Sequence, residues 1–379
     1  MAGTPYPHVR ISGSPLQRGH RYGEQARDRI ARSVEAYAAV FEELAGLRWP
    51  DVLAFARPFA GAIERFDARY MEEIRGLAEG AGQELAAILA LNVRSEIMLS
   101  AKAREARQLG AGVPPGECTA IAALPAVTDS GHTILAQNWD WLPHTTETLV
   151  VLEAEQDEGP SYVTVVEAGL LAKAGFNSCG VGVATNVLIS AADVGEVGVP
   201  YHVTLRALLD AENLPAALAS LQRCSRSASA NYLLAQIGGQ AVDVEARPGD
   251  YSQLRLIAPA DGVLVHANDF LSTSGVTDVG IWWMPDSPFR CMRARSLLEA
   301  REGAVSVEAL QRVLTDHANH PAGICAHADP LDKPTEQGET AASLIMDLED
   351  RLLWLADGTP CIAGYRLLDY GEFLGSVAS

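Results

Sequence analysis

The sequence lacks the short motifs that most directly reveal an enzyme class. It contains no G-x-S-x-G nucleophile elbow, no Walker A phosphate loop and no H-E-x-x-H zinc motif. Its six cysteines lie far apart without a C-x-x-C pair, a spacing that fits neither a disulfide framework nor a zinc knuckle. We therefore expect no cofactor, and we expect most of the cysteines to be small buried hydrophobic residues.

The chain is also poor in positive charge and in long hydrophobic runs. Its net charge is -19 and its pI is near 4.8, whereas nucleic acids and acidic lipids require a basic surface. No apolar run is long enough to span a bilayer, and no basic segment followed by an apolar core opens the sequence. These features predict a cytoplasmic protein that binds neither nucleic acid nor membrane.

What is present divides into a helical part and a strand-rich part. Ser14 is a good helix cap and Pro15 suits a first helical position, and the pattern is helical from there to about Arg107. Apolar residues recur every three or four positions from Tyr22 to Leu44, Trp49 and Pro50 break that run, and two further helices are expected at 65–77 and 84–99. After Cys118, short runs rich in Val, Ile, Leu and Thr alternate with helical stretches, which predicts an α+β fold. The strands are expected at 148–155, 161–167, 180–187, 240–246, 253–258, 262–268, 343–356 and 361–368, and the later helices at 200–211, 214–224, 289–301 and 307–318.

The clearest local pattern lies between residues 110 and 141. A Gly/Pro-rich loop over 110–116 changes abruptly at Cys118 into an apolar run, a turn follows at 129–131, and a second run covers 133–141. Two short runs around such a turn predict a β-hairpin, with Cys118 as its first residue and Asp140 near the end of the partner strand.

Cys118 allows two interpretations. The first is a cysteine buried in a strand, which is frequent in proteins. The second is a nucleophile: if the Glu117–Cys118 peptide bond were cut, Cys118 would carry both a thiol and an α-amine. A free α-amine has a reference pKa of about 8, so it can accept the thiol proton near neutral pH without a separate histidine.

Several segments between residues 73 and 290 add to this second interpretation. They comprise residues 73–82, 118–119, 137–140, 175–181 with Asn186, 266–268 and 287–290. In this order they resemble the autoproteolytic acyltransferase and hydrolase family C45, the isopenicillin-N acyltransferase branch of the amino-terminal-nucleophile (Ntn) hydrolases. That branch is related more distantly to choloylglycine hydrolases and penicillin V acylase.

The resemblance implies a four-layer αββα sandwich made by self-cleavage of an inactive precursor. Residues 1–117 would be a mainly helical segment packed on the core, and residues 118–379 would be the Ntn-hydrolase core, with the two chains remaining associated. Cys118 would first attack its own preceding carbonyl and would then serve as the catalytic nucleophile.

The resemblance also implies roles for further residues. Asp140 would orient the nucleophile's amine, Asn268 would lie near the amine and the developing oxyanion, and Asn186 would supply a second oxyanion-hole group. Arg290 would keep the thiol acidic, with Arg293 one helical turn away as the fallback. Each residue has an ordinary alternative, namely a turn cap for Asp140, turn positions for the asparagines and a solvated helix face for the arginines.

These observations predict a self-processing cysteine amidohydrolase that cleaves a small-molecule N-acyl amide through an acyl-enzyme at Cys118. An acyl-CoA-dependent N-acyltransferase is the alternative, since the two differ in acyl donor and acceptor. Glu117 departs from the glycine that commonly precedes the nucleophile, and a strained scissile bond tolerates glycine best. An unprocessed, non-catalytic Ntn-fold binding protein therefore remains a competing hypothesis, and a homo-oligomer is left open.

Three histidines offer a further hypothesis. His317, His320 and His327 lie close in sequence, and the first two would share a helical face, as in a metal-dependent hydrolase that chelators inhibit. Pro321 ends that helix, and no clustered carboxylate completes a ligand set. We therefore predict no metal site and interpret the histidines as the polar end of a helix.

Overall fold

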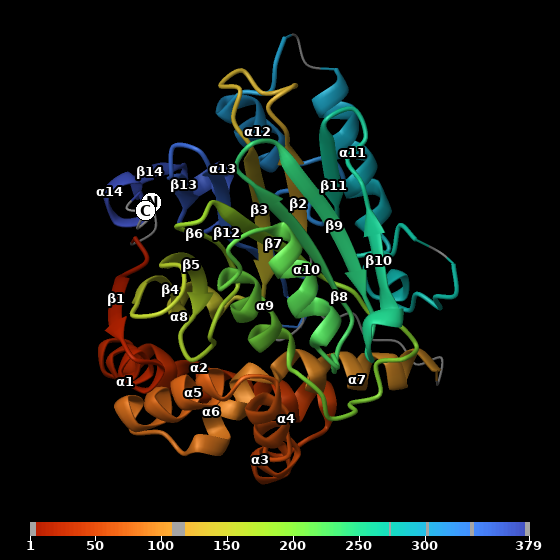
Figure 1. The fold of residues 1–379 in the computed structure, drawn as a ribbon. Helices are drawn as coiled ribbons and strands as arrows, with labels where there is room; N and C mark the ends of the chain where they lie inside the picture. Colours follow the sequence, from red (N-terminus) through yellow and green to blue (C-terminus); the bar gives the residue numbers. More distant parts are fainter. Residues whose placement is uncertain (1–4, 108–117, 273, 301–302, 334–336, 376–379) are drawn as a thin grey trace.

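The computed structural model describes residues 5–107, 118–272, 274–300, 303–333 and 337–375, and two β-sheets lie at its centre (Figure 1). The eight-stranded sheet has the order β1 (His8–Gly13), β4 (Leu149–Gln156), β5 (Tyr162–Glu167), β6 (Ala174–Asn177), β7 (Val181–Val187), β8 (Ala230–Gln236), β9 (Gln240–Ala246) and β10 (Leu254–Ile257). The six-stranded sheet has the order β11 (Val263–His266), β2 (Cys118–Ala123), β3 (Ile134–Trp141), β12 (Glu339–Asp347), β13 (Leu352–Ala356) and β14 (Arg366–Asp369).

The two sheets pack face to face, and helices cover their outer faces. Strands β2, β3 and β11 contact β7, β8 and β9 across the interface. Helices α9 (Tyr201–Leu209) and α10 (Leu214–Arg223) pack on the larger sheet, while α11 (Ser287–Glu299) and α12 (Val307–Leu314) pack on the smaller one. The side chains of strand β2 point alternately to the two faces of its sheet. Cys118 and Ala120 belong to the main core, and Ile121 belongs to the core beneath α11 and α12. The predicted four-layer αββα sandwich is confirmed.

The helical segment before Cys118 forms a layer along one edge of the sandwich (Figure 1). Ser14 and Gln17 form a capping box and Pro15 is the first helical residue, as the sequence predicts. The seven helices described there are α1 (Pro15–Gln25), α2 (Arg27–Ala45), α3 (Trp49–Ala56), α4 (Phe59–Phe66), α5 (Ala68–Ala81), α6 (Leu85–Asn92) and α7 (Arg94–Arg107). The prediction missed β1, which pairs in parallel with β4, so this segment also contributes a strand to the core.

Glycines set the spacing between α1 and α5. A Cβ atom at Gly19 would lie 2.0 Å from the carbonyl oxygen of Glu73, and one at Gly76 would lie 2.1 Å from that of Leu16. A Cβ at Gly80 would lie 2.0 Å from the carbonyl oxygen of His20. Only glycine permits such close backbone contact, which gives the glycines of the 73–82 segment a packing role.

Several elements after Cys118 differ from the prediction. The segment 343–356 is two strands, β12 and β13, which turn back at Arg351, a residue with φ of 59°. The strand expected over 361–368 begins instead as helix α13 (Pro360–Ala363), because Pro360 is pre-set for a first helical position. Strands β6 and β8 were missed. The remaining described α-helices are the short α8 (Thr145–Thr148) and α14 (Gly371–Leu374).

The helix expected over 307–318 ends at Leu314, earlier than predicted. The side-chain amide of Asn138 donates to the carbonyl oxygens of Leu314, at 2.8 Å, and Ile324, at 2.7 Å. A carbonyl already bonded to this buried amide has a partner outside the helix, so the chain leaves the helical path there. His317 and His320 therefore do not share a helical face. Among the described helices, none combines the length and apolar character that a bilayer span requires.

Candidate active site

Cys118 is the first residue of β2, pairs with Trp139 of β3 and is 1% exposed. Three of the predicted site residues meet at its backbone. Its N–H donates to Oδ1 of Asn268 at 2.7 Å, and its carbonyl oxygen accepts from Nδ2 of Asn186 and Nη1 of Arg290, both at 2.9 Å. The fold thus gathers at one strand end residues from β7, from the segment after β11 and from α11.

The structure separates the two candidate arginines. Arg290 is buried, and its guanidinium also donates to Oδ1 of Asn268 at 3.0 Å and to Oδ2 of Asp286 at 2.6 Å. Arg293 is 43% exposed and pairs with Asp316, with a shortest N–O distance of 2.7 Å. Arg290 is therefore the arginine at the predicted nucleophile, and Arg293 faces away from it.

The two asparagines present different groups to Cys118. Asn186 directs its amide nitrogen to the Cys118 carbonyl, and its own oxygen accepts from Nδ2 of Asn231 at 3.1 Å. Asn268 directs its oxygen to the Cys118 nitrogen, while its Nδ2 donates to the carbonyl of Val187 at 2.9 Å. In this arrangement Asn268 is an acceptor for the Cys118 nitrogen, and Asn186 is a donor to the Cys118 carbonyl.

Asp140 lies beside Cys118 on the neighbouring strand. Its Oδ1 accepts from Oγ1 of Thr340 at 2.5 Å. The pairing of β3 with β12 shifts register between Thr340 and Ala342, directly opposite this carboxylate, and such bulges re-aim side chains next to functional sites. Glu117, the residue predicted to precede the cleavage site, lies outside the described residues.

Sequence reasoning missed Lys173, the residue before β6. Its ammonium is buried, lies 3.1 Å from the hydroxyl of Tyr201 and sits 5.4 Å from the ring centre of Trp139. Burial raises the pKa of the Cys118 thiol, and the charge of Lys173 opposes this rise more strongly than that of Arg290. Burial in turn lowers the pKa of Lys173 to about 8. The signal in the sequence was one lysine inside an otherwise apolar run, 168–176.

Removing the charge of Lys173 is expected to make the Cys118 thiol less reactive. We expect Lys173→Met to slow alkylation of Cys118 by iodoacetamide at pH 7, because removing the ammonium raises the pKa of the Cys118 thiol further and so lowers the thiolate fraction. Peptide mass spectrometry after timed labelling measures the rate, and Cys179 in the same sample is the internal control. An unchanged alkylation rate of Cys118 would show that the charge of Lys173 does not lower the pKa of the Cys118 thiol.

His266, at the end of β11, forms a buried charge cluster close to Asn268. Its Nε2 lies 3.1 Å from Oε1 of Glu245 and 4.0 Å from Oδ2 of Asp243, and its Nδ1 lies 2.8 Å from the carbonyl oxygen of Ala267. Burial lowers the pKa of His266, but the two carboxylates outweigh burial and raise it to about 9.

This raised pKa predicts a pH-dependent stability. The folded-state pKa of His266 lies above the unfolded value of about 6.5. Protonated His266 therefore makes its full contribution to the free energy of unfolding below that pH, and this contribution is lost as the pH rises through about 9. The contribution amounts to about 3 kcal/mol. His266→Gln should flatten the fall in unfolding free energy over this range, as measured by denaturant titrations at stepped pH. A fall of the same size in the variant would assign it to other groups.

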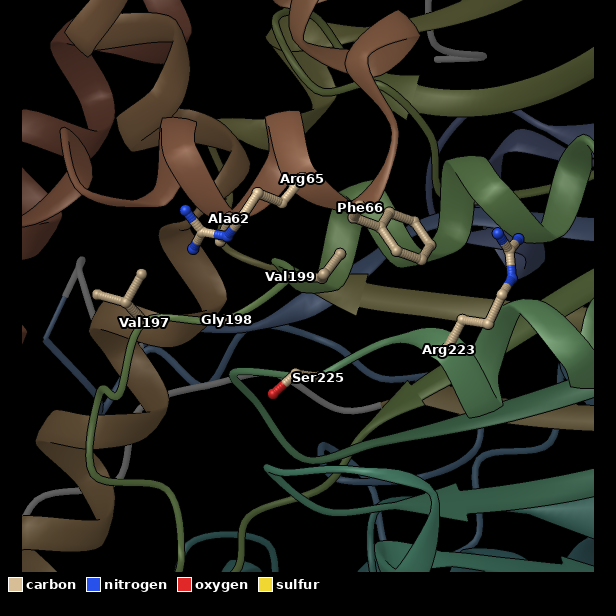
Figure 2. Close-up of a pocket in the computed structure, with 8 residues that line it drawn as sticks. All are labelled: Ala62, Arg65, Phe66, Val197, Gly198, Val199, Arg223 and Ser225. Carbon is tan, nitrogen blue, oxygen red and sulfur yellow. The ribbon is translucent and has the colours of Figure 1, made fainter.

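A surface cavity of about 240 Å³ lies away from these residues (Figure 2). It opens between α4, the segment 197–199 and the end of α10, with Phe66 and Arg223 in its wall. The guanidinium carbon of Arg223 lies 5.9 Å from the ring centre of Phe66. None of the predicted catalytic residues lines this cavity, so it is separate from the site at Cys118.

The chain is similar to a known family and to solved structures. The family described as acyl-coenzyme A:6-aminopenicillanic acid acyl-transferase matches residues 127–360. A curated relative, the acyl-coenzyme A:6-aminopenicillanic-acid-acyltransferase 40 kDa form of Emericella nidulans, is 27% identical over 354 residues, 93% of each chain. A mutant conjugated bile acid hydrolase from Clostridium perfringens matches with 12% identity and a TM-score of 0.44, covering 67% of this chain and 93% of its own. Penicillin V acylase from Agrobacterium tumefaciens matches with 14% identity and a TM-score of 0.39, covering 66% and 86%.

Proposed function

We propose that this chain, which belongs to the family of acyl-coenzyme A:6-aminopenicillanic acid acyl-transferases, is a self-processing cysteine amidohydrolase acting on a small-molecule N-acyl amide. The observation that carries this proposal is the environment of Cys118. A buried cysteine begins a strand, its nitrogen faces an acceptor at 2.7 Å, and its carbonyl is held by two donors. This arrangement suits a residue whose nitrogen becomes a free amine.

In the proposed maturation, Sγ of Cys118 attacks the carbonyl carbon of residue 117. A carbon–sulfur bond forms as the carbon–nitrogen bond breaks, and the nitrogen takes the thiol proton to become the α-amine. Water then hydrolyses the thioester, which leaves a carboxylate on residue 117 and a free thiol on Cys118. Oδ1 of Asn268, 2.7 Å from this nitrogen, would direct the new amine.

In the proposed turnover, the α-amine takes the thiol proton and the sulfur attacks the substrate carbonyl. The amide nitrogen leaves with that proton, and water releases the acyl group from sulfur. Lys173 would favour the thiolate, and Asn186, whose amide nitrogen donates to the Cys118 carbonyl, would place a neutral donor beside the oxyanion. Arg290 would fix the direction of the nucleophile through the Cys118 carbonyl and Asn268, while Asp140, on the strand paired with β2, would help to orient the nucleophile's amine.

The proposal includes continued association of residues 1–117 with residues 118–379 after cleavage. Strand β1 is paired with β4 along its length. Arg94 forms a buried ion pair with Glu167 at 2.7 Å, and Glu96 accepts from the backbone nitrogen of Tyr201 at 2.8 Å. These contacts do not depend on the covalent link at residue 117.

Acyl transfer from acyl-coenzyme A is the second candidate function. The family match and the fungal relative, whose description names that reaction, favour it. Both reactions pass through the same acyl-enzyme at Cys118, and the acceptor decides between them. The net charge of -19 favours a small-molecule substrate over a nucleic acid in either case.

The test joins a mass measurement to a product assay. Purified untagged protein is incubated at neutral pH, and intact mass spectrometry should show two species, residues 1–117 and 118–379. The protein is then given a panel of N-acyl amides, or an acyl-coenzyme A with 6-aminopenicillanic acid. Release of free acid from an amide supports hydrolysis, and a new amide bond to 6-aminopenicillanic acid supports transfer. A full-length chain that converts neither would overturn both in favour of a non-catalytic binding protein.

A further inference from the structure

A second cluster of reactive side chains lies outside the site at Cys118. It brings together His317, Cys325 and His327 from the segment after α12, and Cys361 from α13. Their four ligand atoms all lie within 4.8 Å of one another. This set is a Cys₂His₂ donor group, which is one of the ligand sets of structural zinc sites.

The distances between these atoms match a tetrahedral zinc ion. Nε2 of His327 lies 3.0 Å from Nε2 of His317, 3.7 Å from Sγ of Cys325 and 3.5 Å from Sγ of Cys361. Zinc bonds of about 2.05 Å to nitrogen and about 2.3 Å to sulfur place tetrahedral ligands about 3.3 Å apart for two nitrogens and about 3.6 Å for nitrogen and sulfur.

Hydrogen bonds alone do not explain this convergence. Each imidazole nitrogen carries either one hydrogen or one lone pair, so Nε2 of His327 can satisfy one partner well. Three polar atoms nevertheless converge on it. A cation at the centre of the four atoms would give every one of them a partner, and two thiolates would balance its charge. We propose that His317, Cys325, His327 and Cys361 form a structural zinc site.

The surrounding backbone is already arranged to hold the ligands. The nitrogen of Cys325 donates to the carbonyl of Asp316, and that of His327 donates to the carbonyl of Pro321, both at 3.0 Å. Four protein ligands leave no open position on the ion, so the site is structural and not catalytic. The set also differs from the histidine triad considered in the sequence, because two cysteines complete it and His320 stands beside it, 5.1 Å from His327 between ring centres.

The zinc site would support the active site through Thr340, which contacts both Ala326 and Asp140. Between Cys325 and His327, the nitrogen of Ala326 donates to Oγ1 of Thr340 at 3.0 Å, and that hydroxyl donates to Asp140 at 2.5 Å. The hydroxyl of Thr359, two residues before Cys361, donates to the carbonyl of Thr340 at 3.2 Å. The ion would therefore cross-link the two segments that hold Thr340 in place.

The test measures metal content directly and does not depend on turnover. Full-length protein is produced without a histidine tag in zinc-supplemented medium, and zinc is quantified by plasma mass spectrometry. We expect about one zinc per chain, and at least about tenfold less in Cys361→Ser and in His317→Gln. Both residues are exposed in the structure, so these variants should fold. Cys179→Ser, at a partly buried cysteine elsewhere, is the matched control and should retain zinc.

Cobalt substitution identifies the ligands. Co²⁺ in the wild-type protein should give the intense visible bands of a tetrahedral site together with thiolate charge-transfer bands, and Cys361→Ser should lose part of the latter. Equal zinc in the wild type and in both ligand variants would overturn the proposal. So would peptide mass mapping that finds Cys325 and Cys361 of the wild-type protein joined by a disulfide.

Discussion

Replacing Cys118 with alanine is expected to leave a single full-length chain and to reduce amide turnover by on the order of 10⁶-fold, the loss found when a covalent nucleophile is removed. Alanine lacks the sulfur that would attack residue 117 and later carry the acyl group, so both reactions lose their nucleophile. The contacts to Asn268, Asn186 and Arg290 use main-chain atoms of residue 118. They are therefore retained, and the loss reports chemistry and not a disturbed site.

The same two measurements decide the outcome for this variant. Intact mass spectrometry follows cleavage, and product formation from the best substrate follows turnover. Loss of one buried sulfur should reduce the free energy of unfolding by only about 1 kcal/mol. Cys179→Ala is the matched control and should cleave and turn over as the wild type does. Turnover that survives in the Cys118 variant would place the nucleophile elsewhere.

Local patterns predicted the parts of this fold that are set by nearby residues. The cap at Ser14, the first helical position of Pro15 and the hairpin that begins at Cys118 all depend on interactions within a few residues. The layered arrangement followed only from the family resemblance, because which sheet covers which depends on distant contacts. Strand β1 was missed for the same reason, since its partner β4 lies more than a hundred residues away.

Side chains that act across long sequence separations explain the remaining misses. Helix α12 ends at Leu314 because of an amide on Asn138, 176 positions earlier. The proposed zinc ligands are equally hard to recognise in the sequence, because Cys361 lies 34 positions from His327, which it approaches to 3.5 Å. Lys173 gave a weak signal, because its position near Cys118 depends on how β6 is placed in the sheet.

Arg290→Met is expected to lower kcat/KM by about 10²- to 10³-fold, the usual effect of removing a donor at a catalytic centre. The guanidinium donates to several groups at once, among them the Cys118 carbonyl, Oδ1 of Asn268 and the carboxylate of Asp286. Loss of the guanidinium removes one donor from Oδ1 of Asn268, the atom that would orient the nucleophile's amine. It also leaves a largely buried carboxylate without its cation, so the free energy of unfolding should fall by about 3 kcal/mol.

Arg293→Met is the matched control, because it removes the same charge from the same helix one turn away. The Arg293 side chain is 43% exposed, whereas that of Arg290 is 1% exposed, and an ion pair with such an exposed member contributes at most about 1 kcal/mol. Arg290→Lys separates position from charge, since a lysine keeps the cation but cannot bridge Cys118 and Asn268 as a planar fork does. If Arg290 acts through geometry, the lysine variant should regain stability, measured by denaturant titration, while kcat/KM stays low. If Arg290→Lys recovers both stability and kcat/KM, the site requires only the charge of Arg290. If Arg290→Met and Arg293→Met lose the same amount of kcat/KM, Arg290 does not belong to the site.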